Sequence, residues 1–264
     1  MPHKSVDGEF HVSGHGEPLL LVHGNASTHE TWSGVISHLE RDFQCITYDL
    51  RGHKVQSASV EPYGLDDLVD DLENLRASLN IESAHIVGHS LGGMIAAAYA
   101  RRYPGRVKTL CMMVTPAGRT ADDMAKSNNI SRLIQENGVR ATLETMVQSW
   151  YTDEFVASHP NAIEHRLEQI VAINQDTLLN DLKLYADTEI KGWLGELYTP
   201  TLIITGEFAV GCDARMCEWI HSHLRDSELK IFKGLKNGIL TEIPEQVADK
   251  ISVFVRSREV PTPP

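Results

Sequence analysis

Residues 88–93 read Gly-His-Ser-Leu-Gly-Gly and lie between an apolar run, residues 84–87 (AHIV), and a stretch of small and apolar residues, 92–100 (GGMIAAAYA). A serine with a glycine two residues before it and two residues after it, at a strand-to-helix junction, is the pattern of a nucleophile elbow. The sharp turn forces the serine into a strained backbone conformation, and a side chain at either glycine would collide with the turn. The pattern therefore predicts that Ser90 is exposed at the end of a central strand as a nucleophile.

Short apolar runs and helical patterns alternate through the first part of the chain. Strands buried on both faces by crossover helices need near-continuous apolar composition, which predicts strands at residues 18–24, 43–50, 83–90 and 107–114. Apolar residues at three- and four-residue spacing predict helices at residues 29–41, 65–80 and 92–104. This alternation is typical of βαβ units in an open parallel sheet.

The alternation stops at residues 117–197, where several helical patterns follow one another without a convincing strand. It resumes with the apolar run at residues 199–207. The expected fold is α/β, with a mostly parallel central sheet flanked by helices. The expected core comprises residues 1–116 and 198–264, and residues 117–197 form a helical lid inserted over the carboxyl ends of the strands, where open α/β sheets bind their ligands.

Charge and cysteine usage limit the partners and the compartment. The 264 residues carry a formal charge of −12 and contain no run of Lys and Arg, which excludes nucleic acid and anionic membranes as expected partners. The N-terminal segment lacks the apolar core of a signal peptide, and no apolar run is long enough to cross a bilayer. Neither a disulfide framework nor a CxxC motif is formed by Cys45, Cys111, Cys212 and Cys217. We expect a cytoplasmic monomer or homodimer.

A second motif follows the first buried strand. His23, Gly24 and Asn25 occupy the loop in which a backbone N–H group can face a developing oxyanion. We expect the Asn25 amide to supply one donor and the amide of Leu91, which follows the nucleophile, to supply the other.

Together these motifs resemble the α/β-hydrolase fold family along the whole chain, with YDLRGH at residues 48–53 and LIITGE at 202–207. The size, the helical insertion and the ending at residues 234–251 (GLKNGILTEIPEQVADKI) look like the branch that contains 3-oxoadipate enol-lactone hydrolases, whose relatives include other ester hydrolases and carbon–carbon bond hydrolases. The resemblance implies a serine hydrolase that needs neither a metal nor an organic cofactor.

The chain departs from the family at both partners of the nucleophile. The family places its catalytic acid three residues after the glycine that ends the LIITG strand, where this chain has Ala209, and its catalytic histidine where this chain has Asn237. The last histidine is His223, so none downstream can substitute. Without a general base a serine hydroxyl is a weak nucleophile, although oxyanion hole and binding alone can supply roughly 10³–10⁴-fold catalysis. A further departure, Lys54 and Val55 after the RGH motif, is expected to change only a loop.

We expect the substrate pocket to be lined by His23, Trp32, His89, Trp150 and Tyr151. His23 could equally be a core histidine, and each aromatic residue could be plain core. The acidic string at residues 66–73 has no interleaved histidine and predicts a solvated helix face rather than a metal site.

The sequence thus predicts a hydrolase of a small carboxylic ester or enol-lactone, in a disabled or substituted form. The alternatives are a small-molecule-binding protein or receptor on the same fold, a carbon–carbon bond hydrolase, and a lyase or cofactor-free oxygenase. The absence of the histidine weighs against the last two of these chemistries.

Overall fold

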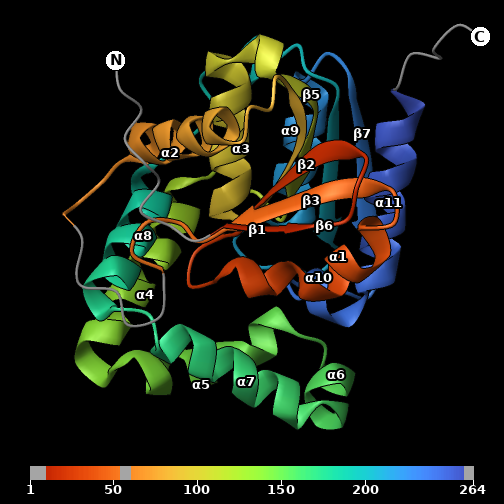
Figure 1. The fold of residues 1–264 in the computed structure, drawn as a ribbon. Coiled ribbons are helices and arrows are strands. Elements are labelled where there is room, and N and C mark those ends of the chain that lie inside the picture. Colours follow the sequence, from red (N-terminus) through yellow and green to blue (C-terminus); the bar gives the residue numbers. More distant parts are fainter. Residues whose placement is uncertain (1–9, 54–60, 259–264) are drawn as a thin grey trace, which may run out of the picture.

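The computed structural model describes residues 10–53 and 61–258. Within them one seven-stranded sheet has the spatial order β1-β3-β2-β4-β5-β6-β7 (Figure 1). Its strands are β1 (Phe10–Ser13), β2 (Glu17–Val22), β3 (Phe43–Tyr48), β4 (Ala84–His89), β5 (Val107–Met113), β6 (Thr201–Gly206) and β7 (Ser227–Phe232). β1 pairs antiparallel with β3, and the other pairs are parallel, so the predicted mostly parallel sheet is confirmed. The apolar patterns do not predict β1, because most of its residues are exposed.

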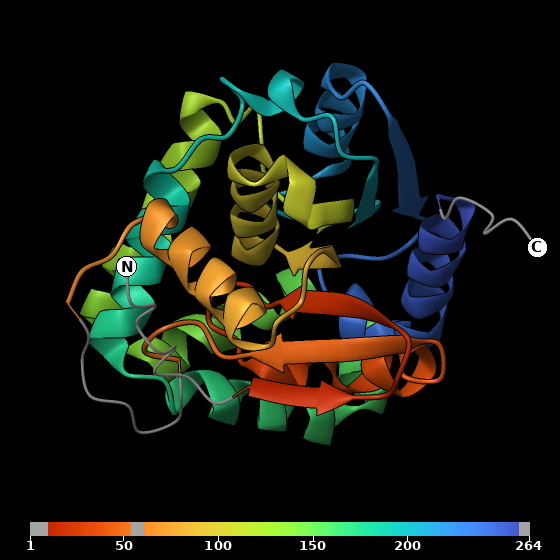
Figure 2. The same ribbon diagram turned by 45° about the horizontal axis from the view of Figure 1, so that its top comes forward.

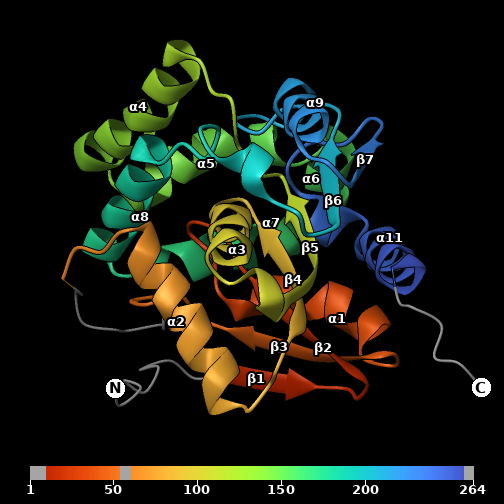
Figure 3. The ribbon, with the colours of Figure 1, turned by 90° about the horizontal axis from the view of Figure 1, so that it is seen from above.

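Helices cover both faces of the sheet, and Figures 2 and 3 show α2 beside α3 on one of them. That face carries α2 (Leu65–Ser78), α3 (Leu91–Arg102) and α9 (Ala214–His223). The opposite face carries α1 (Ser33–Leu39) and α11 (Pro244–Ser257). The short helices are η1 (His29–Trp32), η2 (Pro104–Arg106), η3 (Leu194–Glu196) and α10 (Ile239–Glu242).

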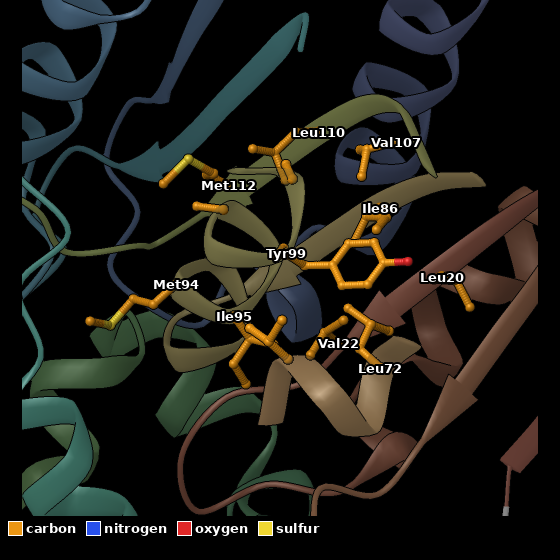
Figure 4. Packing of buried hydrophobic residues seen from close by; sticks show 14 of the residues in the cluster. Leu20, Val22, Leu72, Ile86, Met94, Ile95, Tyr99, Val107, Leu110 and Met112 are labelled. Carbon is orange, nitrogen blue, oxygen red and sulfur yellow. The ribbon is translucent and has the colours of Figure 1, made fainter. Parts of the chain in front are cut away.

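The core is divided by the sheet, because successive side chains of a strand point to opposite faces. Leu20 and Val22 of β2 belong to the apolar cluster beneath α3, and Leu19 and Leu21 belong to the cluster beneath α1 and α11. Figure 4 shows the side chains of the first cluster gathered around Tyr99 of α3. Burial of one such large side chain stabilises the fold by about 1.5–3 kcal/mol. Packing on both faces therefore holds the central strands in place, and the candidate functional site lies at the ends of these strands.

Five α-helices precede η3 between β5 and β6, and we call them the helical insertion: α4 (Ala121–Asn137), α5 (Val139–Trp150), α6 (Asp153–Ser158), α7 (Pro160–Val171) and α8 (Gln175–Asp187). Figure 1 shows α5, α6 and α7 together along one side of the sheet. Thr120 and Asn174 cap α4 and α8 by accepting hydrogen bonds from backbone N–H groups of the first turn. The insertion buries an apolar cluster of its own. Its role as a lid stays a prediction.

None of the helices in residues 10–53 and 61–258 combines the length and the apolar composition needed to span a membrane. The loop change at Lys54 and Val55 lies outside the described residues, as do residues 1–9, which carry most of the segment searched for a signal peptide.

Candidate functional site

Ser90 occupies a tight turn between a central strand and a helix. β4 ends at His89 and α3 begins at Leu91, and Ser90 between them has φ 55° and ψ −118°. The Ser90 N–H donates to the Met113 carbonyl at 2.8 Å, which ties the turn to β5. A Cβ atom at Gly88 would lie 2.2 Å from the Gly92 carbonyl oxygen, and one at Gly92 would lie 2.2 Å from the Val22 oxygen. The turn therefore needs the glycines that flank Ser90, and it holds the serine in a backbone conformation that costs about 1–3 kcal/mol.

The loop after β2 lies against this turn. A Cβ atom at Gly24 would lie 2.8 Å from the His89 carbonyl oxygen and 2.9 Å from the Ser90 Cβ atom, so the loop packs directly against the turn. Asn25 lines the cavity described below, and Ala26 has a left-handed φ of 51°. Leu91 is the first residue of α3, where the N–H group has no partner within its own helix. This arrangement is compatible with an oxyanion hole formed by the amides of Asn25 and Leu91, which stays a prediction.

A cavity of about 450 Å³ opens beside Ser90. It is bounded by the loops that follow β2, β4, β6 and β7 and by the helical insertion. The parallel strands bring these loops to a single sheet edge, where open α/β sheets bind their ligands. Most of the insertion's contribution is apolar: Ile130, Ile134, Leu143, Met146, Ile170, Leu178 and Leu182. Of the predicted pocket residues, the structure places His89, Trp150 and Tyr151 in this lining.

The structure brings the predicted acid and base positions together at the cavity wall. Ala209 and Asn237 both line the cavity. The Asn237 Oδ1 atom accepts from the Val210 N–H at 2.9 Å, and its Nδ2 atom donates to the Val210 carbonyl at 3.0 Å. Both polar atoms of the amide thus bond to the loop after β6, and the amide has no basic atom that could take a proton from Ser90.

Tyr185 of α8 reaches the same cavity, and the sequence patterns do not single it out. Its hydroxyl donates to the Gly211 carbonyl at 3.3 Å, and both Tyr185 and Ser90 line the cavity. Burial raises the pKa of Tyr185 well above its ordinary value, and the neighbouring Cys212 adds to the effect. Burial also raises the pKa of Cys212 to about 12. Both groups therefore stay neutral near pH 7, and Tyr185 can donate a hydrogen bond but cannot act as a base.

His89 and Arg166 form the polar part of the wall beside Ser90 and the loop after β2. Burial, with the positive charge of Arg166, lowers the pKa of His89 to about 4, so its ring is neutral at pH 7. Arg166 Nη2 donates to the Ala26 carbonyl at 2.6 Å, while Nη1 is buried without a hydrogen-bond partner. Burial lowers the pKa of Arg166 from its ordinary value, and the Tyr151 hydroxyl opposes that shift. An arginine nevertheless stays charged in proteins.

The structure does not place His23 and Trp32 in the lining of the cavity beside Ser90. His23 is fully buried, with Nδ1–H donating to the Gly24 carbonyl at 2.9 Å and Nε2 accepting from the Leu50 N–H at 2.9 Å. Burial holds the pKa of His23 well below its ordinary value, so it is a neutral core histidine. Trp32 is fully buried in the cluster beneath α1 and α11.

A buried ionisable cluster joins the core to the insertion. His53 Nε2 lies 2.8 Å from Asp181 Oδ2, and both side chains are fully buried. The Tyr63 hydroxyl donates to the other carboxylate oxygen of Asp181 at 2.5 Å. Burial disfavours the charged imidazole, but the Asp181 carboxylate outweighs that penalty and raises the pKa of His53. The cluster therefore fixes α8 against the loop that follows β3.

In the described part of the chain, no three or more His, Cys, Asp or Glu side chains are grouped so that they could hold a metal ion. The acidic string of α2 is consistent with a surface face: Asp67 accepts from the Gly64 N–H, and Asp71 pairs with Arg51 at 2.6 Å.

Comparison with known proteins agrees with this architecture. The alpha/beta hydrolase fold family matches residues 17–208. The chain is similar to 3-oxoadipate enol-lactonase 1 of Acinetobacter baylyi, with 24% identity over 243 residues that cover 91% of this chain and 89% of that protein.

Solved structures with the same fold include a thermophilic esterase from Thermogutta terrifontis with malate bound, at a TM-score of 0.86 and 23% identity, covering 96% of this chain and 94% of that one. The enol-lactonase from Burkholderia xenovorans aligns at a TM-score of 0.87 and 16% identity, covering 94% of this chain and 96% of that one. At these identities the structural likeness establishes the fold.

Proposed function

Because the chain belongs to the alpha/beta hydrolase fold family, we propose that it hydrolyses a small carboxylic ester or lactone in the cavity beside Ser90. The observation that carries the proposal is the left-handed conformation of Ser90 between β4 and α3, at the wall of a cavity of about 450 Å³. A cavity of this volume accepts a small organic molecule. The relatives named as an enol-lactonase and an esterase support the same class of substrate.

In the proposed reaction, Ser90 Oγ attacks the carbonyl carbon of the substrate and its proton passes to water. The amides of Asn25 and Leu91 stabilise the oxyanion that develops. The bond from the carbonyl carbon to the alcohol oxygen then breaks, and the alkoxide takes a proton from water. A second water molecule attacks the acyl-serine, which releases the acid and restores the Ser90 hydroxyl.

In the proposed reaction no described side chain serves as a general base for the Ser90 hydroxyl, and this limits the rate of hydrolysis. Asn237 holds no proton acceptor suited to the task, the phenol of Tyr185 is neutral, and the lowered pKa of His89 makes its imidazole a weak base. We therefore expect slow turnover, limited to activated esters and strained lactones, with a rate advantage over water on the order of 10³–10⁴-fold.

The test measures hydrolysis of a panel of p-nitrophenyl esters and lactones by the wild-type protein and by Ser90→Ala. The expected result is slow hydrolysis that Ser90→Ala abolishes. Equal rates for the two proteins on every substrate would contradict the assignment of Ser90.

The second candidate is a ligand-binding protein on the same fold. It is favoured by Asn237, which stands where the resemblance places the catalytic base and whose side chain is hydrogen-bonded to Val210 instead. A thermal-shift screen with the same compounds separates the two candidates. Stabilisation by a ligand that Ser90 never hydrolyses would favour the binding protein.

A further inference from the structure

Helix α8 forms part of the cavity wall and is held to the core through a buried carboxylate. Leu178, Leu182 and Tyr185 of α8 line the cavity. Asp181 lies three residues after Leu178 and four before Tyr185, so it shares their side of the helix. Its side chain is fully buried against His53, in the loop after β3. The contact at Asp181 therefore holds the side of α8 that carries the cavity wall.

The pair of His53 and Asp181 can lose its charge complementarity, because its cation is an imidazole. His53 Nε2 lies 2.8 Å from Asp181 Oδ2, and the Tyr63 hydroxyl donates to Oδ1 at 2.5 Å. A buried carboxylate that loses its counter-charge destabilises the fold much more than an exposed one, since water cannot solvate it. While His53 carries a proton, the carboxylate is paired. When His53 loses that proton, the negative charge of Asp181 stays buried without a cation.

The groups around the pair provide no second cation for Asp181. Among the described residues, His53 is the one cation within 4.0 Å of the Asp181 carboxylate. The ring of His23 lies 5.1 Å from that of His53, and burial keeps it neutral. Asp49 favours the charged form of His53. The Arg51 carbonyl lies 3.3 Å from His53 Nδ1, but its guanidinium pairs with a carboxylate of α2.

Other contacts that hold the insertion do not titrate near neutral pH. Arg166 of α7 donates from Nη2 to the Ala26 carbonyl at 2.6 Å. Arg119 donates from Nη1 to the Tyr185 carbonyl at 2.8 Å, near the C-terminal end of α8. An arginine stays charged in proteins, so both contacts persist as the pH changes. The effect of pH is therefore concentrated at the buried pair of α8 and leaves α7 as an internal reference.

We propose that the pair of His53 and Asp181 is a pH-sensitive latch on the cavity wall, which holds α8 in place while His53 carries a proton and loosens α8 when that proton is lost. The latch regulates the site of the proposed function, and it rests on that proposal only in taking the cavity beside Ser90 as the ligand site. Burial disfavours the charged imidazole, but the Asp181 carboxylate outweighs that penalty and raises the pKa of His53. The latch is therefore closed below about pH 6.5, the ordinary value, and loosens as the pH rises through the raised value.

The test is hydrogen–deuterium exchange of the whole protein between about pH 6 and about pH 9, read by mass spectrometry, with each rate divided by the intrinsic rate of the same amide at that pH. Peptides from α8 (Gln175–Asp187) are compared with peptides from α7 (Pro160–Val171). Opening of α8 exposes His53 to water and restores its ordinary pKa. The protection of α8 relative to α7 is therefore expected to fall as the pH rises, and the loss approaches tenfold for each unit by which the pKa of His53 is raised. A ratio that stays flat or rises with pH would overturn the proposal.

Variants assign the effect to the pair. In Asp181→Asn the protection of α8 no longer falls with pH, because no buried carboxylate depends on the imidazole charge. The matched control is Asp187→Asn, which removes an exposed carboxylate of the same helix that pairs with Lys183 and keeps the wild-type profile. A fall that persists in a folded Asp181→Asn variant would contradict the assignment. If that variant does not fold, His53→Gln, which removes the titrating ring, is expected to abolish the fall, and the wild-type comparison of α8 with α7 decides if neither variant folds.

The outcomes also separate the latch from the proposed function. Protection of α8 that falls with pH in a protein that hydrolyses no ester or lactone supports the latch and removes the hydrolase. Hydrolysis that depends on Ser90, in a protein whose α8 protection is indifferent to pH, supports the hydrolase and removes the latch.

Discussion

The side chain of Asn237 hydrogen-bonds both backbone groups of Val210, at 2.9 Å to the N–H and 3.0 Å to the carbonyl. Since Ala209 directly precedes Val210, the two positions at which the family resemblance places a base and an acid lie on neighbouring loops that are bonded to each other. A histidine at position 237 and a carboxylate at position 209 would therefore start close together.

The double variant Ala209→Asp/Asn237→His is expected to raise kcat/KM for activated esters and lactones by about 10³-fold or more, because the imidazole can take the Ser90 proton and the carboxylate can hold the imidazole. Ala209→Asp alone changes almost nothing, and Asn237→His alone gives part of the gain, since such groups act as a unit. Loss of the two hydrogen bonds to Val210 is expected to cost about 1–2 kcal/mol of stability.

The control for this experiment is the triple variant that also carries Ser90→Ala, in which the gain disappears. A double variant that still unfolds in one cooperative transition, with no more than that loss of stability, and hydrolyses no compound of a broad panel would remove the disabled-hydrolase interpretation.

Ser90→Gly is expected to stabilise the protein relative to Ser90→Ala by about 1 kcal/mol, because glycine adopts a φ of 55° without steric cost and alanine does not. The melting temperatures of the two variants, compared in one buffer, measure the difference. An alanine variant at least as stable as the glycine variant would show that the turn is not strained.

Gly92→Ala is expected to lower the free energy of unfolding by about 3 kcal/mol or more, since the new Cβ atom would lie 2.2 Å from the Val22 oxygen and 2.5 Å from the His23 oxygen, both in the backbone. The matched control is Gly105→Ala, where nothing lies within 4 Å of the new atom and stability is expected to stay almost unchanged. Urea denaturation of both variants tests the contrast, and a similar loss in both would contradict the close approach of α3 to the loop after β2.

The His53–Asp181 pair predicts a dependence of stability on pH. The pKa of His53 is raised in the folded state, so the pair's contribution is fully present below about pH 6.5, the unfolded value, and is lost as the pH rises through the folded value. Asp181→Asn should therefore lower the melting temperature more at about pH 6 than at about pH 8. The pKa values of His23 and His89 are lowered in the folded state, so these residues change the stability with pH in the opposite direction. Their effect is the same in wild type and in Asp181→Asn, and it cancels in the comparison.

The matched control for the pH experiment is Asp187→Asn, which removes an exposed carboxylate of the same helix that pairs with Lys183. Its effect on the melting temperature is expected to be small at both pH values. A difference in melting temperature between wild type and Asp181→Asn that widens as the pH rises would contradict a charged His53 in the folded protein.

The strands could be predicted because burial on both faces demands continuous apolar runs. The turn at Ser90 could be predicted because the backbones approach so closely at the two flanking positions that only glycine fits there.

The polar side chains that line the cavity were harder to predict from the sequence. Arg166 carried one signal: it lies three residues after Ile163 and four before Ile170, on the buried side of α7. Tyr185 and the His53–Asp181 pair carried none, because they meet residues far away in the chain. The sequence could not place Trp32, because an aromatic residue after a loop looks the same in sequence whether it packs in the core, as it does here, or faces a ligand.

The apolar cluster of the helical insertion is separate from the two clusters of the sheet. Substitutions at Leu143 or Ile170 can therefore reshape the cavity while the packing that fixes Ser90 stays intact. The two parts of the chain therefore differ in the substitutions that they tolerate. The turn around Ser90 admits almost no change, whereas the insertion can exchange side chains of similar volume, so that the shape of the cavity can be altered without rebuilding the turn.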